Sequence, residues 1–499
     1  MSLRASHRIA EVTLRDLRFS SAEITEFLKV TAGHTASESA VANLQSELEG
    51  WAVGLRLVSL ALRNVEDPEA FLRGLRGGLP HTQDYLLDEV LNAQPLAVRE
   101  MLSRASILER FSGGLLDAIC ASEDPAGNAH LSGDALVDLL QRSNLFAIPL
   151  DTDRKWFRFH HLFGDLLQRE LKRESNADEI NALHLRACDW LESHGLIAES
   201  IRHALAAGDN ERAFDLVDQH RKHAINTDRW HVVESWLRLL PATVGLREPG
   251  VPLAQAWVAY WRFDNEKLGP LVERAASLIN EKTEDPALLG ELDFLQGHLA
   301  YWGGDATTAI RLLERAESHL VGAGPIIEGR VQVLLGLARC QSGHCEMAAE
   351  ALDDRIRRLD PAETILLTQL LGALVFVRLT SGHPIASRGP AARLHAISME
   401  AQMNNTIAWA AYFRGYEHFQ SLHLGRAAAR FAEAVRSPFI LEGPAVVDSF
   451  AGLAISQQLA GDQESAEHTM GRFTSYAREQ GAAHSMSVAQ SCRARLAVL

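Results

Sequence analysis

The most informative segment of the sequence is Trp156-Phe157-Arg158-Phe159-His160-His161-Leu162-Phe163. An apolar run of strand length precedes it at residues 144–150, and residues 151–154 have the composition of a turn. Residues 155–159 then alternate between polar and apolar side chains, which predicts a β-hairpin, and a helical pattern begins after it. Helices followed by a two-stranded ribbon and a closing helix predict a winged-helix domain at residues 96–175.

After residues 156–163 the predicted helices come in pairs. Each pair has a turn residue that is followed five positions later by a small residue. The pairs are Gly208 with Ala213, Gly304 with Ala309, Gly343 with Ala348, Gly382 with Ser387, His423 with Ala428 and Gly461 with Ala466. From Gly304 onward they recur about every 40 residues, slightly longer than a tetratricopeptide (TPR) repeat. Such helix pairs bury their faces only by stacking. Residues 176–499 are therefore predicted to form a TPR-like superhelix with a concave surface.

The residues before the winged helix also have helical patterns. Ser20 or Ser21 is a good helix cap, with Glu23 in the first turn of the helix that follows. The predicted fold class is mainly α: a helical domain and a winged helix, followed by a TPR-like α-solenoid.

Composition and charge exclude several classes of protein. The formal net charge of -15 over 499 residues argues against a nucleic-acid coat, which needs a basic face. The five cysteines are scattered and odd in number, which indicates buried or free thiols in a reducing compartment. Cys340 and Cys345 have no second pair that would complete a zinc site, so no metal is expected. The sequence has no signal peptide and no apolar run of roughly 18 residues, which predicts a cytoplasmic protein without a membrane contact.

Motifs that carry catalysis are absent from the sequence. It contains no G-x-x-x-x-G-K-[ST] phosphate loop, no Gly-x-Ser-x-Gly elbow and no His-Glu-x-x-His metal helix. We therefore expect no catalytic residues and no enzymatic activity from this chain alone.

Several stretches together resemble one family, the large MalT-like, LuxR-type, ATP-dependent bacterial transcriptional regulators. The resembling stretches are residues 16–19, 49–55, 85–91, 144–151, 156–163 and 198–205, together with Trp190 and Gly195. They cover roughly residues 10–245, and beyond these the resemblance is carried by the repeats alone.

The resemblance implies a signal-transducing ATPase domain with a helical extension, a winged helix, a TPR-like sensor and a C-terminal helix-turn-helix that binds DNA. Residues 1–95 are then a remnant of the ATPase domain and its extension, residues 96–175 the winged helix and residues 176–499 the sensor. Intact family members bind ATP or ADP, whereas no cofactor is expected here because the phosphate loop is missing. A truncated gene, a gene fragment and a stand-alone sensor remain alternatives.

Two histidines are candidate nucleotide contacts. The resemblance implies that a winged-helix histidine contacts the phosphate of bound ADP, and His160 matches that position better than His161. An imidazole at a helix N-terminus adds a donor to a site that favours anions. The alternative is that both rings simply pack between the hairpin and the helix.

Basic residues of the predicted hairpin are a second candidate site. Arg154, Lys155 and Arg158 could contact DNA phosphates through the wing. The alternative, which we favour, is a solvated or domain-contacting face.

Aromatic residues of the early repeats are the third candidate. They could line a ligand or partner groove, since aromatic side chains dominate binding sites. These residues are Trp230, His231, Trp257, Trp261 and Trp302, with Asp228 and Arg229 as candidate polar partners. The alternative is that they form the solenoid core.

The predicted function is that of a regulatory sensor or scaffold. An unidentified small-molecule or protein effector would bind the superhelix, and the winged helix would relay the signal. DNA is not expected to bind this chain alone, and self-association is left open. The alternatives are a DNA-binding regulator that acts through the winged helix and an ADP/ATP-dependent switch.

Overall fold

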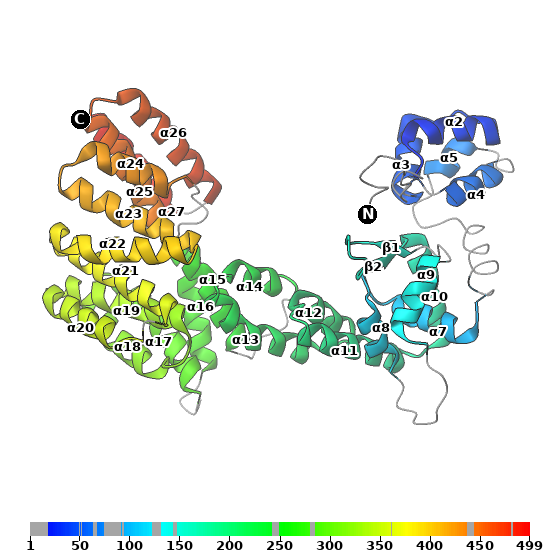
Figure 1. Cartoon of the computed structure of the whole chain (residues 1–499), viewed down its shortest axis with the longest axis horizontal. Coiled ribbons are helices and arrows are strands. Elements are labelled where there is room, and N and C mark those ends of the chain that lie inside the picture. The colour runs from blue at the N-terminus through cyan, green and yellow to red at the C-terminus, as the bar shows by residue number, and fades with distance from the viewer. Residues whose placement is uncertain are drawn as a thin grey trace, which may run out of the picture. The chain divides into compact units, whose positions relative to one another are not determined.

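The chain forms two compact units, Met1–Gly208 and Asp209–Leu499. The computed structural model describes residues 18–48, 50, 52–62, 67–73, 91, 94–121, 131–142, 147–241, 249–279, 285–360, 362–436, 444–480 and 483–499. Over these ranges the structure is helical apart from one two-stranded sheet, so the predicted fold class is confirmed (Figure 1). None of the described helices has the length and apolarity needed to cross a membrane. The domain boundaries at residues 95 and 175 stay a prediction.

The first unit begins with a small group of helices around one apolar cluster. They are α2 (Ser21–Ala32), α3 (Glu38–Leu48), α4 (Ala52–Leu62) and α5 (Pro68–Arg73). The predicted cap at Ser20 is confirmed, because its side chain accepts from the Glu23 amide and its own amide donates to the Glu23 carboxylate at 2.8 Å. This capping box satisfies two backbone donors at the start of α2. Ile24 and Leu28 are fully buried against the other helices.

The predicted winged helix follows in the same unit. Its elements are α7 (Leu96–Ala105), α8 (Gly113–Cys120), α9 (Gly133–Arg142), β1 (Ala147–Pro149), β2 (Phe157–Phe159) and α10 (His161–Glu174). The strands pair antiparallel, with Ala147 opposite Phe159, and Phe111 bridges to Phe157. Alternation within β2 buries Phe157 and Phe159 and leaves Arg158 half-exposed, as expected for a strand with one covered face.

Two further helices complete the first unit, α11 (Ala177–Ser193) and α12 (Ile197–Ala206). Ala187 and Leu191 of α11 belong to the same buried cluster as the winged-helix phenylalanines. The first helical pair after the winged helix is therefore part of its core.

The second unit is a stack of helical pairs, drawn from green to red in Figure 1. The helices up to the middle are α13 (Asn210–Asn226), α14 (Trp230–Leu237), α15 (Gly250–Trp261), α16 (Asn265–Leu278), α17 (Pro286–Trp302), α18 (Ala306–His319), α19 (Pro325–Gln341) and α20 (Cys345–Arg358). The remainder are α21 (Thr364–Thr380), α22 (Pro384–Glu400), α23 (Asn404–Gln420), α24 (Leu424–Ala434), α25 (Pro444–Leu459), α26 (Gln463–Gln480) and α27 (Ala483–Leu496).

The repeat turns have the conformation that their residues predict. The turn glycines have positive φ, for example 85° at Gly304, and the Asp305 carboxylate that follows accepts from the Thr308 amide. Glycine reaches this left-handed region without the cost that a Cβ adds, and aspartate caps the next helix. Ala309, four residues after the cap, is fully buried where the two helices of the pair touch.

In one repeat the predicted turn position differs from the observed one by one residue. The pairing of His423 with Ala428 is wrong, because Leu422 takes the left-handed position with φ 58° and Ala427 is the fully buried residue. Leu422 occupies the glycine position of the other turns without being glycine. A search for turn glycines therefore misses it.

The first helix of each later pair is buried on nearly all sides, whereas the second has one exposed face. In α21 the buried residues include Leu371, Ala373 and Leu379, which point in different directions around the helix. In α24 only one stripe is buried, through Ala427, Phe431 and Ala434. Helices that are apolar all round belong to an interior. The first helices thus form the inner layer of the superhelix.

Candidate functional site

A cavity of about 370 Å³ opens on the inner layer of the second unit. Helices α19, α21 and α23 supply most of its wall, and the turn between α13 and α14 closes one side. The apolar wall consists of Ile326, Val333, Ile365, Phe376, Leu394, Met403, Trp409 and Phe413. The polar lining consists of Asn226, Thr227, Asp228, Arg330, Thr368, Gln369, Asn404, Asn405 and Thr406. A mostly apolar wall with a few polar groups, in this size range, is typical of small-molecule sites.

Hydrogen bonds between distant repeats fix the closing turn. Asn405 Nδ2 donates to Asp228 Oδ2 at 2.8 Å across 177 residues of sequence. Asn226 Nδ2 donates to the Ala323 carbonyl at 2.7 Å, and its Oδ1 accepts from the Ile326 amide at 3.1 Å. The superhelix therefore returns on itself here, and the early repeats form part of the cavity wall.

A smaller cavity of about 100 Å³ borders the first one and shares Arg330, Val333, Phe376 and Trp409 with it. Its remaining wall is largely aromatic, with Tyr260, Trp261, Phe263, His298, Tyr301 and Trp302. Burial lowers the pKa of His298 to about 3, so this imidazole is neutral near pH 7.

Arg330 stands where the two cavities meet. Its guanidinium carbon lies 4.4 Å from the ring centroid of Trp261 and 5.9 Å from that of Trp409. Guanidinium groups stack on indole faces through cation–π attraction. Among the described residues that line the two cavities, Arg330 is the one Lys or Arg side chain.

The residues of the predicted aromatic groove do not lie together in one cavity. Trp261 and Trp302 line the smaller cavity, and Asp228 lines the larger one. Trp230, half-buried at the start of α14, and the exposed His231 line neither of these cavities.

The prediction that Trp257 lines a groove is wrong, because Trp257 is a core residue. Its side chain is 1% exposed, its ring stacks on Phe294, and its Nε1 donates to Glu291 Oε2 at 2.7 Å. Glu291 also accepts from the Arg221 guanidinium at 2.6 and 3.1 Å. Burial alone would lower the pKa of Arg221, but the Glu291 and Asp218 carboxylates outweigh it and raise that pKa.

The cavity residues that the sequence analysis missed lie mostly on α19, α21 and α23. Arg330, Phe376, Trp409 and Phe413 were not selected, although Trp409 and Phe413 are four residues apart and so share a helix face. A tryptophan beside a phenylalanine on an inner helix was the available signal. It does not by itself separate a cavity wall from a packed core.

His160 and His161 lie at the start of α10. His160 is 6% exposed, its ring stacks on His161 at 4.6 Å, and its Nε2 is 3.3 Å from the Leu48 carbonyl oxygen. When this nitrogen carries the proton, it donates a hydrogen bond to the Leu48 carbonyl oxygen. That hydrogen bond connects the end of α3 to the winged helix. The phosphate contact stays a prediction.

The basic hairpin residues separate into two groups. Arg154 and Lys155 are exposed in the turn between the strands, which Asp151 Oδ1 organises by accepting from the Lys155 amide at 2.8 Å. Arg158 is half-exposed on β2, with one N–H directed at the Phe159 carbonyl. Contact between these side chains and phosphate stays a prediction.

A second cluster of titratable groups lies in the first unit beside a cavity of about 150 Å³. His184 Nδ1 of α11 lies 2.8 Å from His203 Nδ1 of α12. One of these two nitrogens must donate and the other accept, so the pair holds a single proton between the rings. Burial first, and then the charges of His184 and Arg202, lower the pKa of His203 to about 4.

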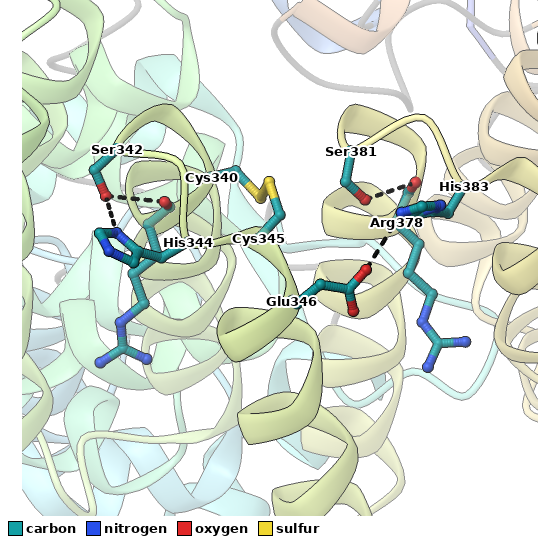
Figure 2. Close-up of a disulfide and its surroundings, with 9 residues drawn as sticks. Cys340, Ser342, His344, Cys345, Glu346, Arg378, Ser381 and His383 are labelled. Atoms are coloured by element: carbon teal, nitrogen blue, oxygen red, sulfur yellow. Dashed lines mark hydrogen bonds and ion pairs between the residues drawn. A yellow bond between two sulfur atoms is a disulfide. The ribbon is translucent and has the colours of Figure 1, made fainter.

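Two of the five cysteines are paired, which corrects the expectation of free thiols throughout. Cys340 in the last turn of α19 is bonded to Cys345 at the start of α20, and their Cα atoms are 4.2 Å apart (Figure 2). The short repeat turn brings the two residues together. Cys120, Cys188 and Cys492 are free.

Figure 2 also shows the equivalent turn of the next repeat, and the two are linked by Glu346 and His383 at 3.2 Å. That turn has the same Ser-Gly-His sequence at residues 381–383, but Leu379 and Pro384 stand where the cysteines would be. The disulfide is therefore a feature of one repeat and not of the repeat pattern.

We expect reduction of this disulfide to lower the free energy of unfolding by about 2 kcal/mol, because it closes only a short loop in the unfolded chain. Urea denaturation of the full chain, with and without dithiothreitol, measures the difference. Dithiothreitol should still destabilise a Cys120→Ser variant and should leave a Cys345→Ser variant unchanged. Alkylation of all five cysteines in the denatured, unreduced chain would contradict the pairing.

The winged-helix segment has a direct counterpart among known families. Residues 87–179 match the family model described as the MalT winged helix domain. This segment is similar to the MalT winged helix. The resemblance to MalT-like regulators that the sequence motifs indicate is thereby confirmed.

Curated relatives are similar to this chain over longer stretches. The serine/threonine-protein kinase PknK of Mycobacterium tuberculosis is 32% identical over 255 residues, which are 51% of this chain and 22% of the kinase. The HTH-type transcriptional regulator MalT of Yersinia enterocolitica is 29% identical over 325 residues, which are 64% of this chain and 35% of that regulator. The chain thus spans well under half the length of these curated relatives.

A solved structure shares the fold. The crystal structure of a signal transduction ATPase with numerous domains (STAND) protein with a tetratricopeptide repeat sensor, from Pyrococcus horikoshii, has a TM-score of 0.56 at 13% identity. The match covers 95% of this chain and 68% of that protein. It supports the TPR-like architecture of the helical repeats.

Proposed function

We propose that this chain is the sensor part of a MalT-like regulator and binds a small-molecule effector in the 370 Å³ cavity of its superhelix. The cavity carries the proposal, because it combines an apolar wall with a polar lining and brings together residues from early and late repeats. An effector that contacts α19, α23 and the turn at residues 226–228 at once would favour one curvature of the superhelix.

The regulatory role is supported by the MalT winged helix and by the TPR-sensor fold. We further propose that the chain acts in the cytoplasm without catalysis of its own. The winged helix would relay effector binding to ATPase and DNA-binding parts of the LuxR-type regulator architecture. A small molecule is preferred over a protein effector because the site is a cavity of small-molecule size.

A screen of the full chain against a metabolite library tests the proposal by thermal unfolding. A ligand at 100 times its Kd should stabilise the folded chain by about 2.7 kcal/mol. The blocking variant is Gly372→Leu, whose Cβ would lie 3.6 Å from Phe413 in ordinary contact, so that the larger side chain takes up space at the cavity wall.

We expect Gly372→Leu to weaken binding at least tenfold. The matched control is Gly389→Leu, at an exposed position of α22 with nothing within 4 Å of the added Cβ. This control should bind as the unchanged chain does. An effector that binds the blocked variant with full affinity would rule out the cavity as its site.

A further inference from the structure

We propose that the effector is a small carboxylate with a flat apolar body, and that Arg330 binds the carboxylate group. This inference rests on the proposed function of the cavity as the effector site. It adds the chemical class of the ligand and the residue that selects it.

Two charged side chains, Arg330 and Asp228, are among the described residues that line the two cavities, and they belong to different helical pairs. Arg330 belongs to α19 and borders both cavities, whereas Asp228 belongs to the turn between α13 and α14 and borders only the larger one. Asp228 is the one Asp or Glu among the described lining residues, and its Oδ2 accepts from Asn405. A ligand anion would therefore be repelled at the closing turn and attracted at the junction of the cavities.

The position of Arg330 over two tryptophan rings suits it to a carboxylate. Trp261 and Trp409 lie within cation–π distance of the guanidinium, at 4.4 and 5.9 Å. The N–H donors of a guanidinium lie in its plane and form a fixed fork. A carboxylate matches that fork with two parallel hydrogen bonds.

The smaller cavity suits the apolar body of such a ligand. Its volume of about 100 Å³ and its aromatic wall fit a single ring. His298 lies in this wall and is neutral near pH 7, and its Nε2 is already 3.2 Å from Asn265 Oδ1. The smaller cavity therefore offers apolar contact, and the positive charge of Arg330 lies where it meets the larger cavity.

Three probes with the same carbon skeleton test the inference: 3-phenylpropionate, 3-phenylpropionamide and 3-phenylpropylamine. Ligand-observed NMR titrations of the full chain at pH 7 give the three affinities. We expect the acid to bind at least tenfold more tightly than the amide or the amine. Equal binding of the acid and the amide would overturn the inference, and so would the absence of binding by the acid.

Variants assign the preference to one side chain. Arg330→Gln should weaken binding of the acid about tenfold and leave the amide unchanged, whereas Arg330→Lys, which keeps the charge, should retain part of the preference. Arg358→Gln, at an exposed position of α20, is the matched control and should bind the acid normally. A thermal unfolding curve of each variant establishes that it folds. Unchanged affinity of Arg330→Gln for the acid would overturn the assignment.

The same titrations separate this inference from the proposed function. If the amide binds as well as the acid, and Gly372→Leu abolishes both, the cavity remains the ligand site and only the carboxylate preference fails. If the acid binds equally to the unchanged chain and to Gly372→Leu, the larger cavity is not its site and the proposed function fails. Because Gly372 does not line the smaller cavity, the role of Arg330 is then decided by the Arg330→Gln variant.

Discussion

We expect the Glu291→Gln variant to lose about 3 to 5 kcal/mol of the free energy of unfolding, the range measured when one partner of a buried ion pair is removed. Arg221 is 0% and Glu291 1% exposed, so the remaining guanidinium would stay in the interior without its main counter-charge. Asp218, which accepts from Arg221 Nε at 2.8 Å, compensates only in part because it is 37% exposed.

Denaturation by urea, followed by circular dichroism of the full chain, measures this loss. The matched control is Glu314→Gln, which removes a half-exposed partner of Arg339 with the same change of charge. Exposed pairs contribute about 1 kcal/mol or less. A loss for Glu291→Gln no larger than that of Glu314→Gln would show that the buried network does not hold the early repeats together.

The second large effect is a loss of stability in mild acid. The pKa of His203 is about 4 in the folded chain and 6.5 in the unfolded chain. Between these values the unfolded state binds a proton that the folded state does not, so the free energy of unfolding falls as the pH falls from 6.5 toward 4. The difference between the two pKa values corresponds to about 3 kcal/mol.

Replacement of the titrating group tests this assignment. His203→Gln should give a smaller fall in stability between pH 6.5 and pH 4.5 than the unchanged chain shows. His194→Gln, at an exposed position of the same unit, should keep the full pH dependence. An identical pH dependence in the unchanged chain and in His203→Gln would contradict a buried, neutral His203.

Local features of the fold were predictable because local chemistry carries them. The cap at Ser20, the hairpin before His160 and the left-handed turn at Gly304 each follow from a few neighbouring residues. The register at residues 422–427 was missed because Leu422 takes a backbone conformation that glycine normally marks. The disulfide was missed because five scattered cysteines do not reveal which two a repeat turn brings together.

The candidate site was predictable only in part, because inner helices are apolar on all sides. Trp257, Trp261 and Trp409 are all tryptophans on inner helices, but the first packs in the core and the other two border cavities. Asp228 was a candidate only because it is a neighbour of Trp230. It lines the larger cavity and accepts a hydrogen bond from Asn405, which is 177 residues away in the sequence. No periodicity in the sequence records a contact of that separation.

The kinds of element, the repeat, the winged helix and the resemblance to MalT-like regulators follow from the amino-acid sequence alone, because turn residues, helix caps and short motifs act over a few positions. Where those elements enclose a cavity depends on how the repeats pack in three dimensions. The curvature of a superhelix is the sum of small rotations between neighbouring repeats, and each rotation depends on how side chains pack at one interface. That sum brings Asn405 to Asp228 and places Arg330 between Trp261 and Trp409.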